Sequence, residues 1–246
     1  MKPIIFHTGL TPPPEIQYND FKILHTPTIT VEFNHHHIPQ DIVECLKSNP
    51  VAIIMSKNAV SGLKKWLKKY NLSVDVFGDT PFWTVGEQTH QNLLDELYIE
   101  SWHPKLMTGE GIIQSLIEKD QTRILLISAH EPQQNFIDGL HAAGIHFFHF
   151  PTYTTQILSD AKLTAEFIDD ENNFMVCTSP STVDGILKSL SLTHLADLKT
   201  KLTSIGPTTS SAICERGGSV YHESTEQKIA TLYYEIITMD CSHEQP

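Results

Sequence analysis

The sequence predicts an α/β protein built from two similar halves, each with a parallel sheet. A strand and turn at residues 51–62 recur at residues 174–185, where Ser179 follows Ser56 by 179 − 56 = 123 positions. A second turn, Val85-Gly86-Glu87-Gln88-Thr89, recurs as Ile205-Gly206-Pro207-Thr208-Thr209 at an offset of 206 − 86 = 120. Strands also alternate with helical segments along the chain, which is typical of parallel sheets covered by helices on both faces.

The first half is interpreted from its apolar periodicity, helix caps and prolines. A strand at residues 3–8 is followed by three consecutive prolines, which remove amide donors, so a loop is expected at residues 9–14 in place of a helix. Residues 34–39 break the next strand and indicate a linker. The expected strands are 28–33, 51–55, 74–77, 82–85, 123–127 and 145–150, and the expected helices are 40–47, 57–69, 87–97, one that begins after Thr108, and 132–143.

The second half repeats this pattern after residues 151–155, which are expected to cross back as a second linker. The expected strands are 174–177, 202–205 and 219–222, and the expected helices are 160–168, one capped by Ser179, one from Gly206 to Gly217, and 225–238. All four repeated turns then follow the carboxyl ends of strands, where doubly wound sheets bind ligands. Because helix N-termini present unpaired N–H groups, four such turns facing one cleft predict a site for a large anion.

Composition narrows the class of partner. The net charge is −12, which argues against nucleic acid and anionic membranes because phosphate binding uses Lys and Arg. Four cysteines, Cys45, Cys177, Cys214 and Cys241, show no CxxC spacing, which fits reduced thiols in the cytoplasm. We find no export signal at the start and no apolar run near the roughly 20 residues that span a bilayer.

Two cofactor interpretations are weak. Adjacent histidines at positions 35–37 point to alternating sides of an extended segment, so a solvated linker is expected rather than a metal site. The repeated turns also lack the glycine-rich fingerprints of nucleotide binding. Ser56 and Ser179 are ordinary N-caps in most proteins with this pattern, and a tyrosine on a strand is more often packed than catalytic. Duplication of the serine turns favours a ligand-binding role for them.

In this order and spacing, the motifs resemble those of the uroporphyrinogen-III synthase family along most of the chain. The strand-Ser-x-x-Ala/Thr-Val turn occurs at residues 56–60 and 179–183, and the Gly-x-x-Thr turn occurs at residues 86–89 and 206–209. Residues 151–155, Pro-Thr-Tyr-Thr-Thr, are similar to the family's tyrosine-bearing crossover. Gly144 precedes that crossover, and Gly217 and Gly218 precede the final strand.

The resemblance implies two similar α/β domains joined by two antiparallel linker strands. One domain would be discontinuous, with residues 1–33 and 152–246, and the other would span residues 37–150, with linkers at 34–36 and 151. It implies an enzyme without metal or organic cofactor that closes hydroxymethylbilane to uroporphyrinogen III with inversion of ring D. We expect a monomer in the cytoplasm, with no nucleic-acid or membrane partner.

The resemblance also implies site residues. Tyr153 is the candidate acid that protonates the departing hydroxyl. Otherwise the enzyme has to orient the substrate so that the substituted carbon of ring D lies nearest the electrophile. The candidate groups that hold its eight carboxylates are amides and hydroxyls of Ser56, Lys57, Thr89, Thr155, Ser179, Ser181, Thr208 and Thr209.

One departure from the family pattern keeps alternatives open. Members usually continue the first strand with Thr-Arg and a helix, whereas His7-Thr8-Gly9 and the proline-rich stretch stand here. An arginine that would hold a carboxylate is therefore missing. One alternative is a catalytically weak or inactive tetrapyrrole- or anion-binding module of the same fold. Another is a two-lobed receptor for a different small acid that closes on a hinge.

Overall fold

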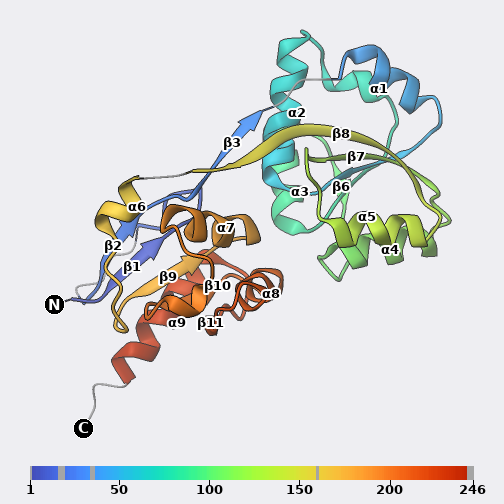
Figure 1. Cartoon of the computed structure of the whole chain (residues 1–246). Coiled ribbons are helices and arrows are strands. Elements are labelled where there is room, and N and C mark those ends of the chain that lie inside the picture. The colour runs from blue at the N-terminus through green and yellow to red at the C-terminus, as the bar shows by residue number, and fades with distance from the viewer. Residues whose placement is uncertain (1, 16–19, 34–36, 159–160, 243–246) are drawn as a thin grey trace. The chain divides into compact units, whose positions relative to one another are not determined.

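A computed structural model describes residues 2–15, 20–33, 37–158 and 161–242 (Figure 1). The chain divides into two compact units. Unit 1 comprises Met1–Thr30 and Gln156–Pro246, and unit 2 comprises Val31–Thr155. The linker expected at residues 34–36, with His35 and His36, lies outside the described residues.

Unit 1 contains a parallel sheet in the order β11-β10-β9-β1-β2. Its strands are β1 (Ile4–His7), β2 (Lys22–His25), β9 (Phe174–Cys177), β10 (Lys201–Ser204) and β11 (Val220–Glu223). Its helices are α6 (Ala161–Glu166), α7 (Pro180–Ser189), the 3-10 helix η2 (Leu195–Asp197), α8 (Pro207–Glu215) and α9 (Ile229–Ser242).

Both faces of this sheet are covered, because side chains alternate along each strand. Ile4 and Phe6 of β1 pack with α7 residues such as Ile186 on one face. Ile5 packs with α9 residues such as Ile236 on the other face. A strand buried on both sides reads as a continuous apolar run, which is what the sequence of β1 and β9 shows.

Unit 2 contains a sheet in the order β3-β8-β7-β4-β5-β6. Its strands are β3 (Ile29–Phe33), β4 (Val51–Ile54), β5 (Phe82–Thr84), β6 (Ser101–Trp102), β7 (Arg123–Ala129) and β8 (His146–Ile157), where the first two residues of β3 and the last two of β8 belong to unit 1. Its helices are α1 (Pro39–Leu46), α2 (Lys57–Lys69), the 3-10 helix η1 (Val74–Phe77), α3 (Glu87–Leu97), α4 (Gly109–Glu118) and α5 (Gln134–Ala142). The strands from β4 to β8 pair in parallel, and β3 runs beside β8 in the opposite direction (Figure 1).

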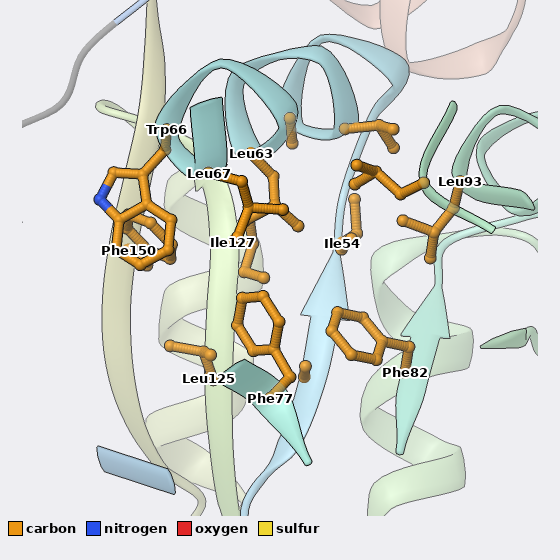
Figure 2. Packing of buried hydrophobic residues seen from close by; sticks show 14 of the residues in the cluster. Ile54, Leu63, Trp66, Leu67, Phe77, Phe82, Leu93, Leu125, Ile127 and Phe150 are labelled. Carbon is orange, nitrogen blue, oxygen red and sulfur yellow. The ribbon is translucent and has the colours of Figure 1, made fainter. Parts of the chain in front are cut away.

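The amphipathic helix α2 covers one face of this sheet (Figure 2). Its apolar side places Leu63, Trp66 and Leu67 over strand residues that include Ile127 and Phe150. The Trp66 and Phe150 rings lie 5.1 Å apart edge to face, and Trp66 Nε1 donates to the His37 carbonyl at 2.8 Å. Helices α4 and α5 pack on the opposite face. Both sheets thus confirm the predicted parallel α/β class.

Several local predictions differ from the structure. Residues 74–77, predicted as a strand, form η1, because Ser73 Oγ accepts from Asp75 N at 3.3 Å and Gly78 adopts a φ of +54° that closes the turn. The strand predicted at 145–150 and the linker predicted at 151–155 form one continuous strand, β8. Strands β2 and β6 were not predicted, since each is short and lacks apolar alternation. The loop predicted at residues 9–14 is confirmed.

Candidate functional site

The four repeated turns occupy equivalent places in the two units. Each begins two residues after a strand and provides the N-cap of the next helix. Ser56 and Gly86 cap α2 and α3 after the neighbouring strands β4 and β5, whereas Ser179 and Gly206 cap α7 and α8 after β9 and β10. Within each unit, the serine turn and the glycine turn therefore lie side by side at the carboxyl edge of the sheet.

In unit 2 the structure brings two of the predicted site residues together. Ser56 Oγ lies 3.0 Å from the Tyr153 hydroxyl, and it also accepts from Ala59 N at 3.2 Å as the helix cap. Tyr153 is 8% exposed and belongs to the core under α2. Burial raises the pKa of the Tyr153 phenol, and the hydrogen bond with Ser56 partly offsets this by lowering it.

A bulge in β8 places the phenol there. Ser128 of β7 pairs with Pro151, but Ala129 pairs with Tyr153, so Thr152 is an extra residue in β8. Thr152 Oγ1 donates to the Ala59 carbonyl of α2 at 3.3 Å, and Tyr153 contacts the cap of the same helix. Two consecutive side chains of β8 thus both face α2, which regular strand alternation would not allow.

The serine turn of unit 1 is built differently. Ser179 Oγ accepts from Thr182 N at 3.3 Å, as a cap does. The Thr182 hydroxyl in turn accepts from the amides of Thr178 and Ser179, each at 3.2 Å, and donates to the Ser179 carbonyl at 2.7 Å. The Ser179 amide, which we expected to hold a carboxylate, therefore already has a partner inside the turn. Ala59 stands at the equivalent position of unit 2 and has no hydroxyl.

The remaining predicted holders differ in accessibility. Thr89 and Thr209 are 6% and 3% exposed, and their amides donate to the Gly86 and Gly206 carbonyls at 3.1 and 3.0 Å. Their N–H groups are thus used within the helix. The other predicted holders reach the surface to some extent: Lys57 and Thr208 are exposed, and Thr155 and Ser181 are half-buried.

A third repeat, which the sequence interpretation missed, adds to the site. His25-Thr26-Pro27-Thr28-Ile29-Thr30 matches His149-Phe150-Pro151-Thr152-Tyr153-Thr154 at an offset of 149 − 25 = 124. The contacts match as well, since Thr28 Oγ1 donates to the Thr182 carbonyl at 3.1 Å as Thr152 does to Ala59. Ile29 stands where unit 2 has Tyr153. The shared His-x-Pro-Thr-x-Thr pattern was the signal that could have revealed this repeat.

The first segment of the chain, residues 2–15, contains a buried histidine. His7 is fully buried, with Nε2 2.9 Å from the Thr11 carbonyl and Nδ1 3.0 Å from the Tyr233 hydroxyl. Only an N–H can pair with a carbonyl, so Nε2 carries the proton and Nδ1 accepts from Tyr233. Burial lowers the pKa of His7 to about 4. In the described part of this segment, residues 2–15, no arginine is present.

Other site types find little support in the residues that the structure describes. These residues contain no group of three or more His, Cys, Asp or Glu that could hold a metal ion. No helix among them is long and apolar enough to cross a membrane. A surface pocket of about 560 Å³ in unit 1, lined by Lys201, Gly218 and Tyr221 among others, lies at the amino ends of β10 and β11. It is therefore at the opposite edge of the sheet from the turns.

Comparisons with known proteins agree with this arrangement. The family model "Uroporphyrinogen-III synthase HemD" matches residues 14–233. The crystal structure of uroporphyrinogen-III synthetase from Helicobacter pylori is similar at 18% identity and a TM-score of 0.63, covering 97% of this chain and 100% of that one. A mutant uroporphyrinogen III synthase from Thermus thermophilus gives 12% identity, a TM-score of 0.62, and coverage of 96% and 98%.

Identities this low show a shared fold, and no curated sequence gives a significant match. The family model, however, matches most of the 246 residues, including all four turns and the crossover. The chain belongs to the uroporphyrinogen-III synthase family.

Proposed function

We infer that this protein is a uroporphyrinogen-III synthase, a cyclising lyase of tetrapyrrole (heme) biosynthesis. Its substrate would be hydroxymethylbilane, which it closes to uroporphyrinogen III with inversion of ring D. Membership of the family supports this inference. One structural observation carries it further: the only tyrosine in the family-like crossover is buried and hydrogen-bonded to a repeated serine turn, Ser56 to Tyr153 at 3.0 Å.

The phenol suits the first step of the reaction. Tyr153 would donate its proton to the hydroxyl of the substrate's hydroxymethyl group, and the carbon–oxygen bond would break to release water. The electron pair of the adjacent pyrrole nitrogen replaces the lost bond and leaves an azafulvene-type cation. Attack by the substituted carbon of ring D then gives a spiro intermediate. The bond from this carbon to the methylene group of ring C breaks next, which leaves an azafulvene-type cation on ring C, and the free carbon of ring D attacks that cation. This carbon loses its proton as the inverted macrocycle forms, so the phenolate can be protonated again and the net change is loss of water.

Binding in this proposal relies on dipoles and hydroxyl groups, since the chain has a net charge of −12. The substrate carboxylates would be held by the first turns of α2, α3, α7 and α8. The proposed holders are Ser56, Lys57, Thr89, Thr155, Ser179, Ser181, Thr208 and Thr209. Where Thr182 occupies the Ser179 amide, the hydroxyls of Ser179 and Ser181 are the groups left to bind. That all four turns bind a single ligand stays a prediction.

The isomer ratio tests this function. Purified protein is incubated with enzymatically generated hydroxymethylbilane, and the products are oxidised and separated into isomers I and III. We expect isomer III with the wild type and a fall in its rate by about tenfold to a thousandfold in Tyr153→Phe. Tyr98→Phe is the matched control, since Tyr98 is 86% exposed and lies at the C-terminal end of α3, whereas the turn is at the N-terminal end of that helix. Isomer I alone from the wild type would reject the assignment.

A second candidate is a tetrapyrrole-binding module of the same fold with little or no activity. The first segment favours it, because a proline-rich loop and the buried His7 stand where the family has an arginine and a helix. It predicts that calorimetry detects binding of uroporphyrinogen III while the isomer ratio stays at its spontaneous value.

We also propose the settings in which the protein acts. It would be a cytoplasmic monomer without cofactor, nucleic-acid partner or membrane partner, and its domains would be residues 1–33 with 152–246 and residues 37–150. Cell fractionation and light scattering of the purified protein test the location and the oligomeric state. Limited proteolysis within residues 34–36 and near residue 151 tests the domain limits.

A further inference from the structure

The internal repeat sets two equivalent serines in different surroundings. We propose that Ser56 is a positioning residue that orients the Tyr153 hydroxyl for proton transfer, whereas its counterpart Ser179 only contributes to substrate binding. This inference rests on the proposed function and assigns a different role to each of the two serine turns. It goes beyond the expectation that both serines hold carboxylates in the same way.

The hydrogen-bonding capacity of Ser56 supports this role. A serine hydroxyl has one proton and two acceptor positions. Ala59 N, at 3.2 Å, takes up one acceptor position of Ser56 Oγ and thereby fixes the oxygen at the start of α2. The serine proton remains available for the Tyr153 oxygen at 3.0 Å. When it is donated there, the phenol proton must point elsewhere and can pass to a bound substrate.

The backbone under Tyr153 is held in place independently. Gly62 lets α2 approach β8 so closely that a Cβ at this position would lie 2.6 Å from the Thr152 carbonyl oxygen. The hydrogen bond from Thr152 to the Ala59 carbonyl adds a second link between strand and helix. The position of the Tyr153 ring is therefore set by β8 and α2, and the direction of its hydroxyl is set by Ser56.

The other repeat provides an internal comparison. Ser179 caps α7 through Thr182 N at 3.3 Å, much as Ser56 caps α2. The Thr28 and Gly185 contact likewise matches the Thr152 and Gly62 contact. The residue that follows Thr28, however, is Ile29, which has no hydroxyl. Removal of either serine hydroxyl thus removes a similar helix cap, but only Ser56 also has a phenol as its partner.

The negative charge that Tyr153 carries after proton transfer also supports this role of Ser56. Once Tyr153 gives up its proton, a phenolate remains in a nearly closed setting, since the residue is 8% exposed. Burial makes that anion costly, and this is why the pKa of Tyr153 is raised. A hydrogen bond donated by Ser56 stabilises the anion and lowers the pKa again. Loss of the Ser56 hydroxyl should therefore slow the proton transfer. The backbone amide of residue 56, which remains in the alanine variant, can still hold a substrate carboxylate, so substrate binding should change little.

Steady-state kinetics of Ser56→Ala, Ser179→Ala and Ser56→Thr test the proposal. We expect Ser56→Ala to lower kcat about tenfold, the effect of losing one hydrogen bond to a charged state, with KM changed less than about twofold. Ser179→Ala should instead raise KM and leave kcat within about twofold. Ser56→Thr keeps the hydroxyl and should restore kcat. Equal effects of the two alanine variants on kcat would overturn the proposal, as would failure of threonine to rescue.

A spectroscopic titration separates this inference from the proposed function. Ionisation of Tyr153 is followed by ultraviolet difference spectroscopy and identified by its absence in Tyr153→Phe. Ser56→Ala should raise the pKa of this phenol and Ser179→Ala should not. An unchanged pKa in Ser56→Ala contradicts the inference even if the wild type makes isomer III. If the wild type makes none, the proposed function fails, and the titration still decides whether Ser56 acts on Tyr153. Ser56→Gly, a residue that also caps helices well, replaces the alanine variant should that one not fold.

Discussion

Gly62→Ala is expected to destabilise unit 2 and displace Tyr153, although alanine is the better helix former. The new Cβ would lie 2.6 Å from the Thr152 carbonyl oxygen and 2.7 Å from Thr152 Cβ. Because Cβ contacts under 3.0 Å essentially never occur, α2 or β8 must move by at least 3.0 − 2.6 = 0.4 Å. Such overpacking against backbone costs about 1–3 kcal/mol. The higher helix propensity of alanine offsets about 1 kcal/mol, so we expect a net loss of up to about 2 kcal/mol.

The assay uses the distribution of tryptophans. All three, Trp66, Trp83 and Trp102, belong to unit 2, so their fluorescence during urea unfolding reports on that unit. Gly185→Ala is the matched variant in unit 1, where the new Cβ would lie 2.5 Å from Thr28 Oγ1. It should leave the tryptophan-detected transition in place while far-ultraviolet circular dichroism shows a destabilised unit 1.

Activity gives a second measure of the same change. The shift carries Tyr153 away from Ser56, so Gly62→Ala should lower kcat by about three- to tenfold, less than the roughly hundredfold cost of a 1 Å misplacement. Gly139→Ala is the control within unit 2, because its new Cβ meets only the flexible end of Ile113. A Gly62→Ala variant that unfolds at a higher urea concentration than the wild type would refute the reasoning, since helix propensity would then dominate the contact.

Three further predictions concern unit 1. The pKa of His7 is lowered to about 4, so the unfolded chain binds a proton before the folded protein does as the pH falls. The free energy of unfolding should therefore decline by up to about 3 kcal/mol between about pH 6.5 and pH 4. His7→Gln should flatten this pH dependence in urea titrations followed by circular dichroism. Among the described residues, Thr26 has a buried hydroxyl without a hydrogen-bond partner, and unit 2 has Phe150 at that position, so Thr26→Val should stabilise the protein by about 1 kcal/mol; a lower thermal midpoint would contradict this. Burial raises the pKa of the Cys177 thiol to about 12, so a thiol reagent should modify the exposed Cys214 in the native protein and reach Cys177 only after unfolding, which peptide mapping would detect.

Local patterns in the sequence were enough to locate most elements and all four turns. Ser56 and Ser179 begin helices because a serine oxygen can accept from the amide three residues later, which depends on neighbours in the chain alone. The apolar spacing of Leu63, Trp66 and Leu67 likewise identifies the buried side of α2. The strand predicted at residues 74–77 from their composition is wrong, because the local cap by Ser73 makes them a 3-10 helix.

The contact between Ser56 and Tyr153 was decided by tertiary structure. Ser56 and Tyr153 are 97 residues apart, and they meet only because β4 and β8 both flank β7 and a bulge at Thr152 turns the phenol toward α2. The sequence determined by itself that a serine cap and a tyrosine crossover exist, since each is a local pattern. Their contact depends on strand order and on the close packing at Gly62, as does the contrast with Ile29 in the other unit. Both features involve residues that are distant in sequence, so they leave no periodic signal in it.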